Sequence, residues 1–155
     1  MEALLTLTWH ESRSGVLDAV AGDSRGADRV VVAARLPLLA DISVADNIAL
    51  PRQYHLGIAT TLARLQAREY VARLLPAKCA EQYPEALTLA ETFAALWLRA
   101  IALPGRTVVL ESPLMSFGVD EAVLRESVTR CYGLFRHAHA HELNAAKNRR
   151  RRPQS

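Results

Sequence analysis

The sequence predicts an α/β fold, in which a small parallel or mixed sheet is packed by long helices. Arg29–Ala34 and Thr107–Glu111 are short runs rich in valine, and the second is apolar on both faces, which is typical of a strand buried inside a sheet. Between these runs, leucine and alanine recur at helical spacing over Ile58–Leu75 and dominate Leu89–Leu103. Helical segments placed between buried strands are the pattern of α/β proteins.

The composition sets the broad class. The chain has 155 residues, half of them hydrophobic, which is enough for one domain with a buried core, expected over residues 1–145. The formal charge is +3, and Arg149–Arg152 alone supply four positive charges, so the body is roughly neutral. We expect residues 146–155 to form a basic, disordered tail.

Three sequence features predict a cytoplasmic protein, which would associate with a membrane only peripherally, through a partner. Cys79 and Cys131 form no CxxC pattern, which indicates reduced thiols. The N-terminus has no basic signal segment. The longest apolar run, around Phe93 to Leu103, is interrupted by Arg99 and is too short to cross a membrane.

The N-terminal segment is ambiguous. Met1–Trp9 suits a short helix by its leucines, but leucine and threonine also alternate there as in a strand. Ser12–Gly15 predicts a turn, Val16–Val20 a short edge strand and Gly22–Gly26 another loop. The buried strand Arg29–Ala34 follows.

Two helices are expected next, and they make up most of a helical subdomain at about residues 44–87. Ser43 can cap the first, with Asp46 at the third position. Ile58–Leu75 predicts the second, which Pro76 ends. We expect its apolar face to consist of Leu62, Leu65, Val71, Ala72 and Leu75.

A third helix and a central strand follow the break at Tyr83–Pro84. Thr88 and Glu91 form a capping-box pattern at the start of Leu89–Leu103, a helix that should be buried on most sides. Pro104–Gly105 ends this helix, and the strand Thr107–Glu111 comes next.

The C-terminal part predicts a loop over Leu114–Val119 and then one last helix. Asp120 and Glu121 open this helix, which we expect to run to about Asn144. Its apolar face would consist of Val123, Leu124, Val128, Cys131, Leu134 and Phe135.

Two of these segments resemble the ATP-binding subunit of ABC transporters in order and spacing. Tyr83–Pro84, the helix residues Leu98–Leu103 and the strand end Val108–Pro113 follow the layout of that family's signature helix and its aspartate-glutamate-proline strand. Leu38–Pro51 is similar, nearly position by position, to the family's loop and helix after its glutamine-ended strand. The resemblance implies a truncated P-loop-NTPase-like core with a helical subdomain.

The resemblance also implies a surface for a partner. In the family, this loop and helix meet the coupling helices of the transmembrane permease. The positions that would make this contact are Leu38, Leu39, Ile42, Asn47 and Tyr54.

A phosphate-binding loop is missing from the sequence. Such a loop needs glycine-rich backbone N–H groups, a lysine on the phosphates and a serine or threonine on Mg²⁺. No GxxxxGK[ST] motif occurs. When Ser14–Val16 is matched to a serine-glycine turn of the family, the missing loop falls just before Met1, and residues 1–9 stand where the following helix should be.

Other catalytic positions of the family have also changed. The magnesium-contacting glutamine aligns with Ala34, the magnesium-binding aspartate with Glu111 and the catalytic glutamate with Ser112. Alanine has no donor or acceptor, and serine cannot polarise a water as a carboxylate would. The signature loop aligns with Leu87, Thr88, Leu89, Ala90 and Glu91, where leucine and alanine replace the two glycines.

Two further family features are expected to be lost. The aspartate of the loop after the catalytic strand aligns with Gly118, although a two-residue slip would supply Asp120. The family's switch histidine would lie beyond the last helix, after one more strand. We expect the chain to end without either that strand or that histidine.

The sequence therefore predicts a non-catalytic relative of the ABC ATP-binding subunit that needs no cofactor. It would dock to a membrane permease or to a partner ATPase subunit, and it could dimerise. One alternative is a fragment of a genuine ATP-hydrolysing subunit, which would use ATP and Mg²⁺. Another is a nucleic-acid-binding module led by the arginine tail, which is disfavoured because no aromatic residues are interleaved with the basic ones.

Three histidines near the C-terminus suggest a metal site. On the predicted helix, His137 and His141 share a face, but His139 points elsewhere and no third ligand joins them. We therefore predict no metal site and an exposed, polar helix end.

Overall fold

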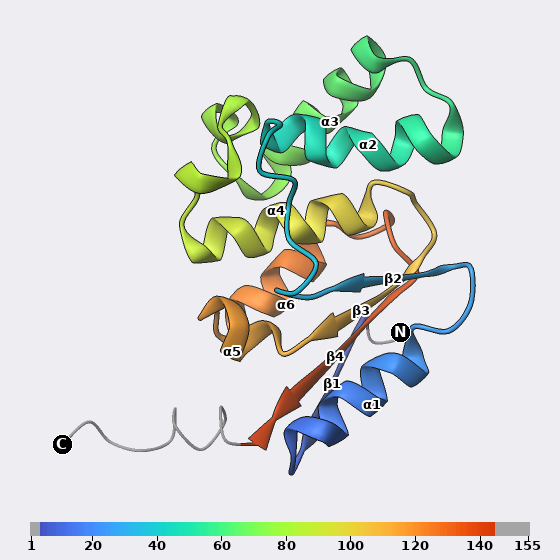
Figure 1. The fold of residues 1–155 in the computed structure, drawn as a ribbon, viewed down its shortest axis with the longest axis vertical. Coiled ribbons are helices and arrows are strands. Elements are labelled where there is room, and N and C mark those ends of the chain that lie inside the picture. The colour runs from blue at the N-terminus through green and yellow to red at the C-terminus, as the bar shows by residue number, and fades with distance from the viewer. Residues whose placement is uncertain (1–3, 145–155) are drawn as a thin grey trace, which may run out of the picture.

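A parallel four-stranded sheet forms the centre of the protein (Figure 1). The computed structural model describes residues 4–144. The strand order is β1-β4-β3-β2, and every neighbouring pair is parallel. The strands are β1 (Leu5–His10), β2 (Arg29–Val32), β3 (Thr107–Glu111) and β4 (His137–Leu143). The predicted α/β class is confirmed, and the two predicted strands pair directly as β2 and β3.

Strand β3 is central because both of its faces are apolar. Thr107 to Leu110 are buried, and the strand lies between β4 and β2. Val109 packs against Val16 and Val20 on one face of the sheet. Val108 and Leu110 join the larger core on the other face. Alternate residues of β3 therefore serve two separate layers.

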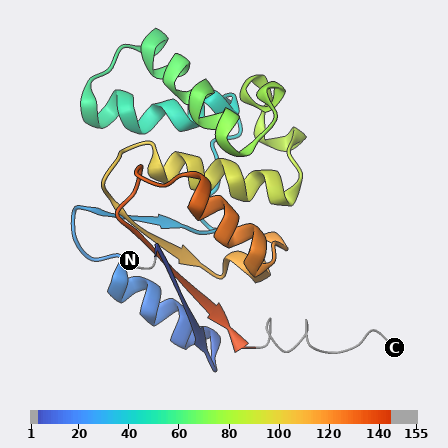
Figure 2. The same cartoon turned by 180° about the vertical axis from the view of Figure 1, so that it is seen from behind.

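Helices cover both faces. Helix α1 (Arg13–Asp23) lies on the near face in Figure 1. Helices α5 (Pro113–Phe117) and α6 (Glu121–Arg130) follow β3, and α6 lies in front of the strands when the molecule is seen from behind (Figure 2). Helix α4 (Leu89–Ile101) fills the core beside β2, with Trp97, Phe93 and Leu98 fully buried.

The remaining helices form a lobe that α4 separates from the sheet (Figures 1 and 2). They are α2 (Val44–Leu56), α3 (Thr60–Leu74) and the short 3₁₀ turns η1 (Ala77–Glu81) and η2 (Pro84–Ala86). Ser43 caps α2 as predicted, because its hydroxyl accepts a hydrogen bond from the N–H of Asp46 at 3.1 Å. The Thr88–Glu91 capping box of α4 is also confirmed.

The predicted apolar face of α3 is correct at Val71 and Leu75, which are buried, but wrong at Leu62, Leu65 and Ala72. Leu62 and Leu65 are 50% and 53% exposed, whereas Ala63 and Ala67 are buried. Helix α3 packs along α2. Small side chains let two helix backbones approach closely, so alanine takes the contact and the larger leucines stay outside.

The N-terminal segment resolves as a strand followed by a helix. Leu5–His10 is β1, so the strand interpretation of the ambiguous segment is the right one. The edge strand predicted at Val16–Val20 is wrong, since these residues lie within α1. Ser12 caps α1 by accepting a hydrogen bond from the N–H of Gly15, which begins the helix where a turn was expected.

The C-terminal predictions need two corrections. The expected loop Leu114–Val119 contains the short helix α5, which begins at Pro113. The last helix is capped by Asp120 as expected, but it ends at Arg130, and His137–Leu143 is the strand β4. Pairing with β1 and β3 on either side supplies this strand with backbone partners that lie far away in the sequence.

The predictions about the cysteines, membrane spans and the basic tail can be compared with the structure. Cys79 and Cys131 are free and buried. Within residues 4–144, no helix is both long and apolar enough to cross a membrane. The predicted basic tail, with Arg149–Arg152, lies outside the described residues.

Candidate functional site

The carboxyl edge of the sheet is the first candidate site, because open parallel sheets bind ligands beyond the carboxyl ends of their strands. A small pocket of about 140 Å³ opens there between the start of α1 and the end of β3. Its lining includes Arg13, Glu111, Ser112, Met115 and Ser116. The predicted site residues Glu111 and Ser112 therefore both line this small pocket.

The turn between β1 and α1 occupies the place where a strand–loop–helix unit carries a phosphate loop. This turn consists of Glu11 and Ser12. The placement of the missing loop before Met1 is wrong, because it depended on a helix at residues 1–9, where the structure has a strand. The turn lacks the length, the glycines and the lysine that cradle phosphate, and Glu11 adds a negative charge.

The acidic residue at the end of β3 is engaged by an arginine. The Nε of Arg35 lies 3.1 Å and 3.3 Å from the two carboxylate oxygens of Glu111. The Glu111 side chain is only 13% exposed. Ala34, one residue before this arginine, is exposed and offers no polar side-chain atom. The arrangement therefore pairs the Glu111 carboxylate with a cation at the end of β3.

Ser112 has an unusual backbone. Its φ of 46° is in the left-handed region, and it is the one non-glycine residue with positive φ in the described part of the chain. Its N–H donates to the carbonyl oxygen of His141 at 2.8 Å, which ties the end of β3 to β4. The side chain makes no capping bond to α5. Ser112 thus serves as a bend between strand and helix.

The signature-loop equivalent lies at the start of α4, away from the β3 edge pocket. The Thr88 hydroxyl accepts a hydrogen bond from the N–H of Glu91 at 3.1 Å, and the Glu91 carboxylate accepts one from the N–H of Thr88 at 2.9 Å. The Glu91 pKa is lowered, chiefly by the hydrogen bond from the Thr88 backbone N–H. Leu87 is half-buried, Ala90 is exposed, and Leu89 is 57% exposed. This segment presents an apolar surface with a closed helix cap.

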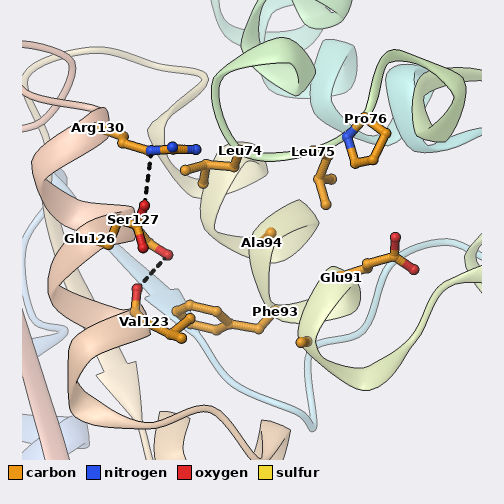
Figure 3. A pocket seen from close by; sticks show the side chains of 11 residues that line it. Leu74, Leu75, Pro76, Glu91, Phe93, Ala94, Val123, Glu126, Ser127 and Arg130 are labelled. Atoms are coloured by element: carbon orange, nitrogen blue, oxygen red, sulfur yellow. Dashed lines mark hydrogen bonds and ion pairs between the residues drawn. The ribbon is translucent and has the colours of Figure 1, made fainter.

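A second pocket, of about 260 Å³, adjoins the signature-loop equivalent (Figure 3). It lies between the end of α3, the start of α4 and one side of α6. In Figure 3 the ring of Phe93 points toward Val123, while Leu74 extends toward the α6 side. The polar groups at its α6 wall are engaged locally: Arg130 pairs with Glu126 at 3.3 Å, and Ser127 donates to a backbone carbonyl.

The five predicted partner-contact residues divide into two groups. Leu38 and Asn47 are buried. Asn47 accepts from the N–H of Leu39 at 2.7 Å and donates to the carbonyls of Leu39, Ile42 and Ser43, so it shapes the loop before α2. Leu39 and Tyr54 are 54% and 84% exposed, and Ile42 is half-buried. Only these last three offer surface to a partner.

Leu39 and Tyr54 border a groove of about 390 Å³ between α2, α4 and the edge strand β2. Its other apolar lining includes Val30, Leu50, Pro51, Leu96 and Leu103, its cationic lining is Arg99 and Arg106, and His55 also lines it. Arg99 donates to the carbonyls of Leu36 and Pro37, at 2.7 Å and 2.8 Å, which holds the preceding loop against α4. Burial lowers the pKa of Arg99.

The structure also assembles a cluster that the helical prediction missed. On strand β4, His137, His139 and His141 share one face, and α1 packs there. The Nδ1 of His139 and the Nε2 of His141 lie 2.9 Å and 2.6 Å from the same carboxylate oxygen of Asp23. The period-2 alternation of histidine and alanine in the sequence was the available signal for this strand.

The expectation that no further strand follows the last helix is wrong, because β4 follows α6. Its histidines lie beyond the last helix, where the family's switch histidine was expected to be lost. The imidazole of His141 is engaged on both sides, by Asp23 and by His10 at 2.9 Å. Burial is the main cause that lowers the pKa of His139, and the neighbouring Asp23 opposes this shift.

Comparison with solved structures places this fold near the ATP-binding cassettes. The chain is similar to the dimeric, post-hydrolysis structure of the ATP-binding cassette MJ0796 bound to ADP and Pi, with a TM-score of 0.51 and 15% identity. The match covers 74% of this chain and 52% of that chain, so this protein spans about half the length of its neighbour. At this identity, the likeness concerns the fold. Sequence comparison finds no matching family model and no matching curated protein.

Proposed function

We propose that this protein is a non-hydrolysing relative of the ABC ATP-binding subunit that works by docking to a partner protein. The single observation that carries the non-catalytic part is the two-residue turn between β1 and α1. The fold supplies the strand and helix between which a phosphate loop would lie, yet Glu11 and Ser12 cannot form that loop.

The electrostatics of the carboxyl edge support the same proposal. The Arg35–Glu111 ion pair removes the carboxylate that would hold Mg²⁺, and Ser112 supplies no general base. The N–H of Gly15, at the start of α1, is already bonded to the Ser12 hydroxyl. No cofactor is therefore proposed for this edge.

The docking surface that we propose is the groove beside Leu39 and Tyr54. Its occupant would be an amphipathic helix from a cytosolic segment of a membrane permease, with an apolar face and acidic flanks. The apolar lining suits the first property, and Arg99 and Arg106 favour the second by charge complementarity. The protein would then reside in the cytoplasm, at the inner face of the membrane.

A second candidate partner is another ATPase subunit, which would contact the signature-loop equivalent. Tyr83 and Leu89 are 50% and 57% exposed there. The structural neighbour is dimeric by its description. We favour the groove because it combines an apolar lining with the positive charges of Arg99 and Arg106.

Two measurements separate catalysis from docking. The purified chain should hydrolyse Mg-ATP no faster than buffer, and calorimetric titration with Mg-ATP should give no binding heat at the carboxyl edge. Hydrolysis that Glu111→Gln abolishes would instead support the alternative of a genuine ATPase.

Docking is tested by affinity co-purification of the tagged chain from solubilised membranes. We expect a multispanning permease to be retained by wild type and lost from Leu39→Asp and Tyr54→Ala. Leu65→Asp is the matched control, because Leu65 is 53% exposed on α3 and does not line the groove. Retention of a soluble ATPase subunit, lost with Leu89→Asp, would favour the second partner. Recovery of no such protein would overturn the docking proposal.

A further inference from the structure

The face of the sheet beneath α1 carries an unusual group of side chains. Asp23 comes from the last turn of α1, and His139 and His141 come from β4. Their ligand atoms all lie within 4.8 Å of one another. The Nδ1 of His139 and the Nε2 of His141 meet at one oxygen of Asp23, at 2.9 Å and 2.6 Å. One nitrogen of each imidazole therefore faces the same carboxylate oxygen.

We propose that Asp23, His139 and His141 bind a divalent transition-metal ion, for which Zn²⁺ is the best-matched probe. Imidazole nitrogen and carboxylate oxygen are ligands that Zn²⁺ accepts, and three protein ligands leave a fourth position for water. Ligand atoms around a tetrahedral ion lie about 3.3 Å apart, so a small outward movement of the Asp23 carboxylate would admit the metal. This inference does not depend on the proposed docking function.

The opposite nitrogen of each histidine is held by β1. The Nε2 of His139 lies 3.1 Å from the hydroxyl of Thr8, and the Nδ1 of His141 lies 2.9 Å from the Nε2 of His10. With metal bound, the proton of each neutral imidazole would reside on this outer nitrogen and be donated to Thr8 or His10. Such outer hydrogen bonds orient metal-binding histidines and set their tautomer. Thr8 and His10 are therefore positioning residues.

The position of Asp23 is a second, independent sign. A carboxylate in the last turn of a helix is opposed by the helix dipole, and no basic residue occupies the last turn of α1. The acid is thus placed against a local preference, which is frequent at functional sites. Its side chain is 33% exposed and that of His139 is 28% exposed, so an ion can enter from solvent.

A bound ion would join α1 to β4. Within the described residues, α1 is the helix whose Val16 and Val20 cover this face, through a small cluster with Val109. A metal that joins the end of α1 to β4 would stabilise this thinly covered layer, since binding to the folded state alone raises stability.

The experiment uses the full chain, purified without a histidine tag and treated with chelator. Zn²⁺ is titrated calorimetrically, and Co²⁺ is titrated with visible absorption as a readout of its coordination. We expect one ion per chain, a Kd in the micromolar range or tighter, and a melting temperature that rises with Zn²⁺ and falls with EDTA. Asp23→Ala should abolish the Co²⁺ spectrum, and Thr8→Val should weaken Zn²⁺ binding by at least about tenfold.

Asp18→Ala and His137→Ala are the matched controls. Asp18 is an exposed acid on the same helix, and His137 lies on the same strand but pairs with Thr6. Both should bind Zn²⁺ as wild type does. Asp23→Ala removes a carboxylate that the helix dipole disfavours, so this variant is expected to fold. Absence of stoichiometric Zn²⁺ binding, or equal binding by Asp23→Ala and wild type, would overturn the proposal.

Discussion

The Nε–H of Arg35, in the loop after β2, donates a bifurcated hydrogen bond to the Glu111 carboxylate at the end of β3. The guanidinium Nε lies 3.1 Å and 3.3 Å from the two carboxylate oxygens. Glu111 is the acid that the resemblance assigns to magnesium, and in this protein it has a fixed cation instead. Our proposal of a non-hydrolysing edge depends in part on this pair.

Removing the arginine should cost little stability and restore no activity. Arg35 is 55% exposed, so Arg35→Ala should lower the free energy of unfolding by about 1 kcal/mol or less. The loss should shrink at high salt because the pair is screened. Urea unfolding at low and high salt measures both effects. Mg-ATP hydrolysis by this variant above background would contradict the account of the edge.

Asn47 should be among the most sensitive positions in the lobe. Its buried amide satisfies the backbone of the loop before α2, at Leu39, Ile42 and Ser43. Asn47→Ala would leave these groups without a partner, so we expect a loss of about 2–4 kcal/mol in urea unfolding. Gln53→Ala, on the same helix, should change stability by about 0.5 kcal/mol or less. Equal effects of the two changes would show that Asn47 does not hold the loop.

The capping box predicts both a mutational and a pH effect. Thr88→Ala should destabilise the protein by about 1 kcal/mol, because α4 loses its N-cap. The Glu91 pKa is lowered from its ordinary value of 4.5, mainly by the Thr88 backbone hydrogen bond. Its contribution is therefore present above pH 4.5 and is lost as pH falls through the folded-state pKa.

Chemical unfolding at stepped pH checks this sign. Glu91→Gln keeps a side chain that can accept the Thr88 N–H but cannot titrate, so its stability should fall less below pH 4.5 than that of wild type. A parallel pH dependence in the two proteins would assign the acid sensitivity to other carboxylates.

Ser112 should tolerate glycine. Its φ of 46° is unfavourable for a residue with a Cβ, so Ser112→Gly should raise the free energy of unfolding by up to about 1 kcal/mol. Ser112→Val should destabilise it, since a β-branched side chain fits this conformation poorly. Thermal unfolding of the two variants measures the difference, and opposite signs are expected.

Local sequence signals predicted the caps and the central strand well. Ser43, Thr88 and Asp120 cap helices through nearby residues, and the apolar run of β3 already marks a strand buried on both faces. Strand β4 was missed because histidine and alanine also suit a helix. Its true partners, β1 and β3, are distant in the sequence, so pairing and not propensity decides its structure.

The candidate sites also combine features that the sequence predicts with features that only the structure shows. That no GxxxxGK[ST] motif occurs can be seen from residue types alone. Two other features depend on tertiary contacts between residues that are distant in the sequence. They are the ion pair of Glu111 with Arg35 and the cluster of Asp23 with His139 and His141. No spacing rule along the sequence reports such contacts.

The most direct test of the docking account is photo-crosslinking from Tyr54, replaced by a photoreactive phenylalanine analogue, in intact membranes. Tyr54 is 84% exposed at the groove, so the substitution should leave the fold unchanged. We predict a crosslink to a cytosolic segment of a multispanning permease, and none from the same analogue at Leu65. Crosslinks from Leu65 alone, or none to a membrane protein from Tyr54, would contradict the central claim.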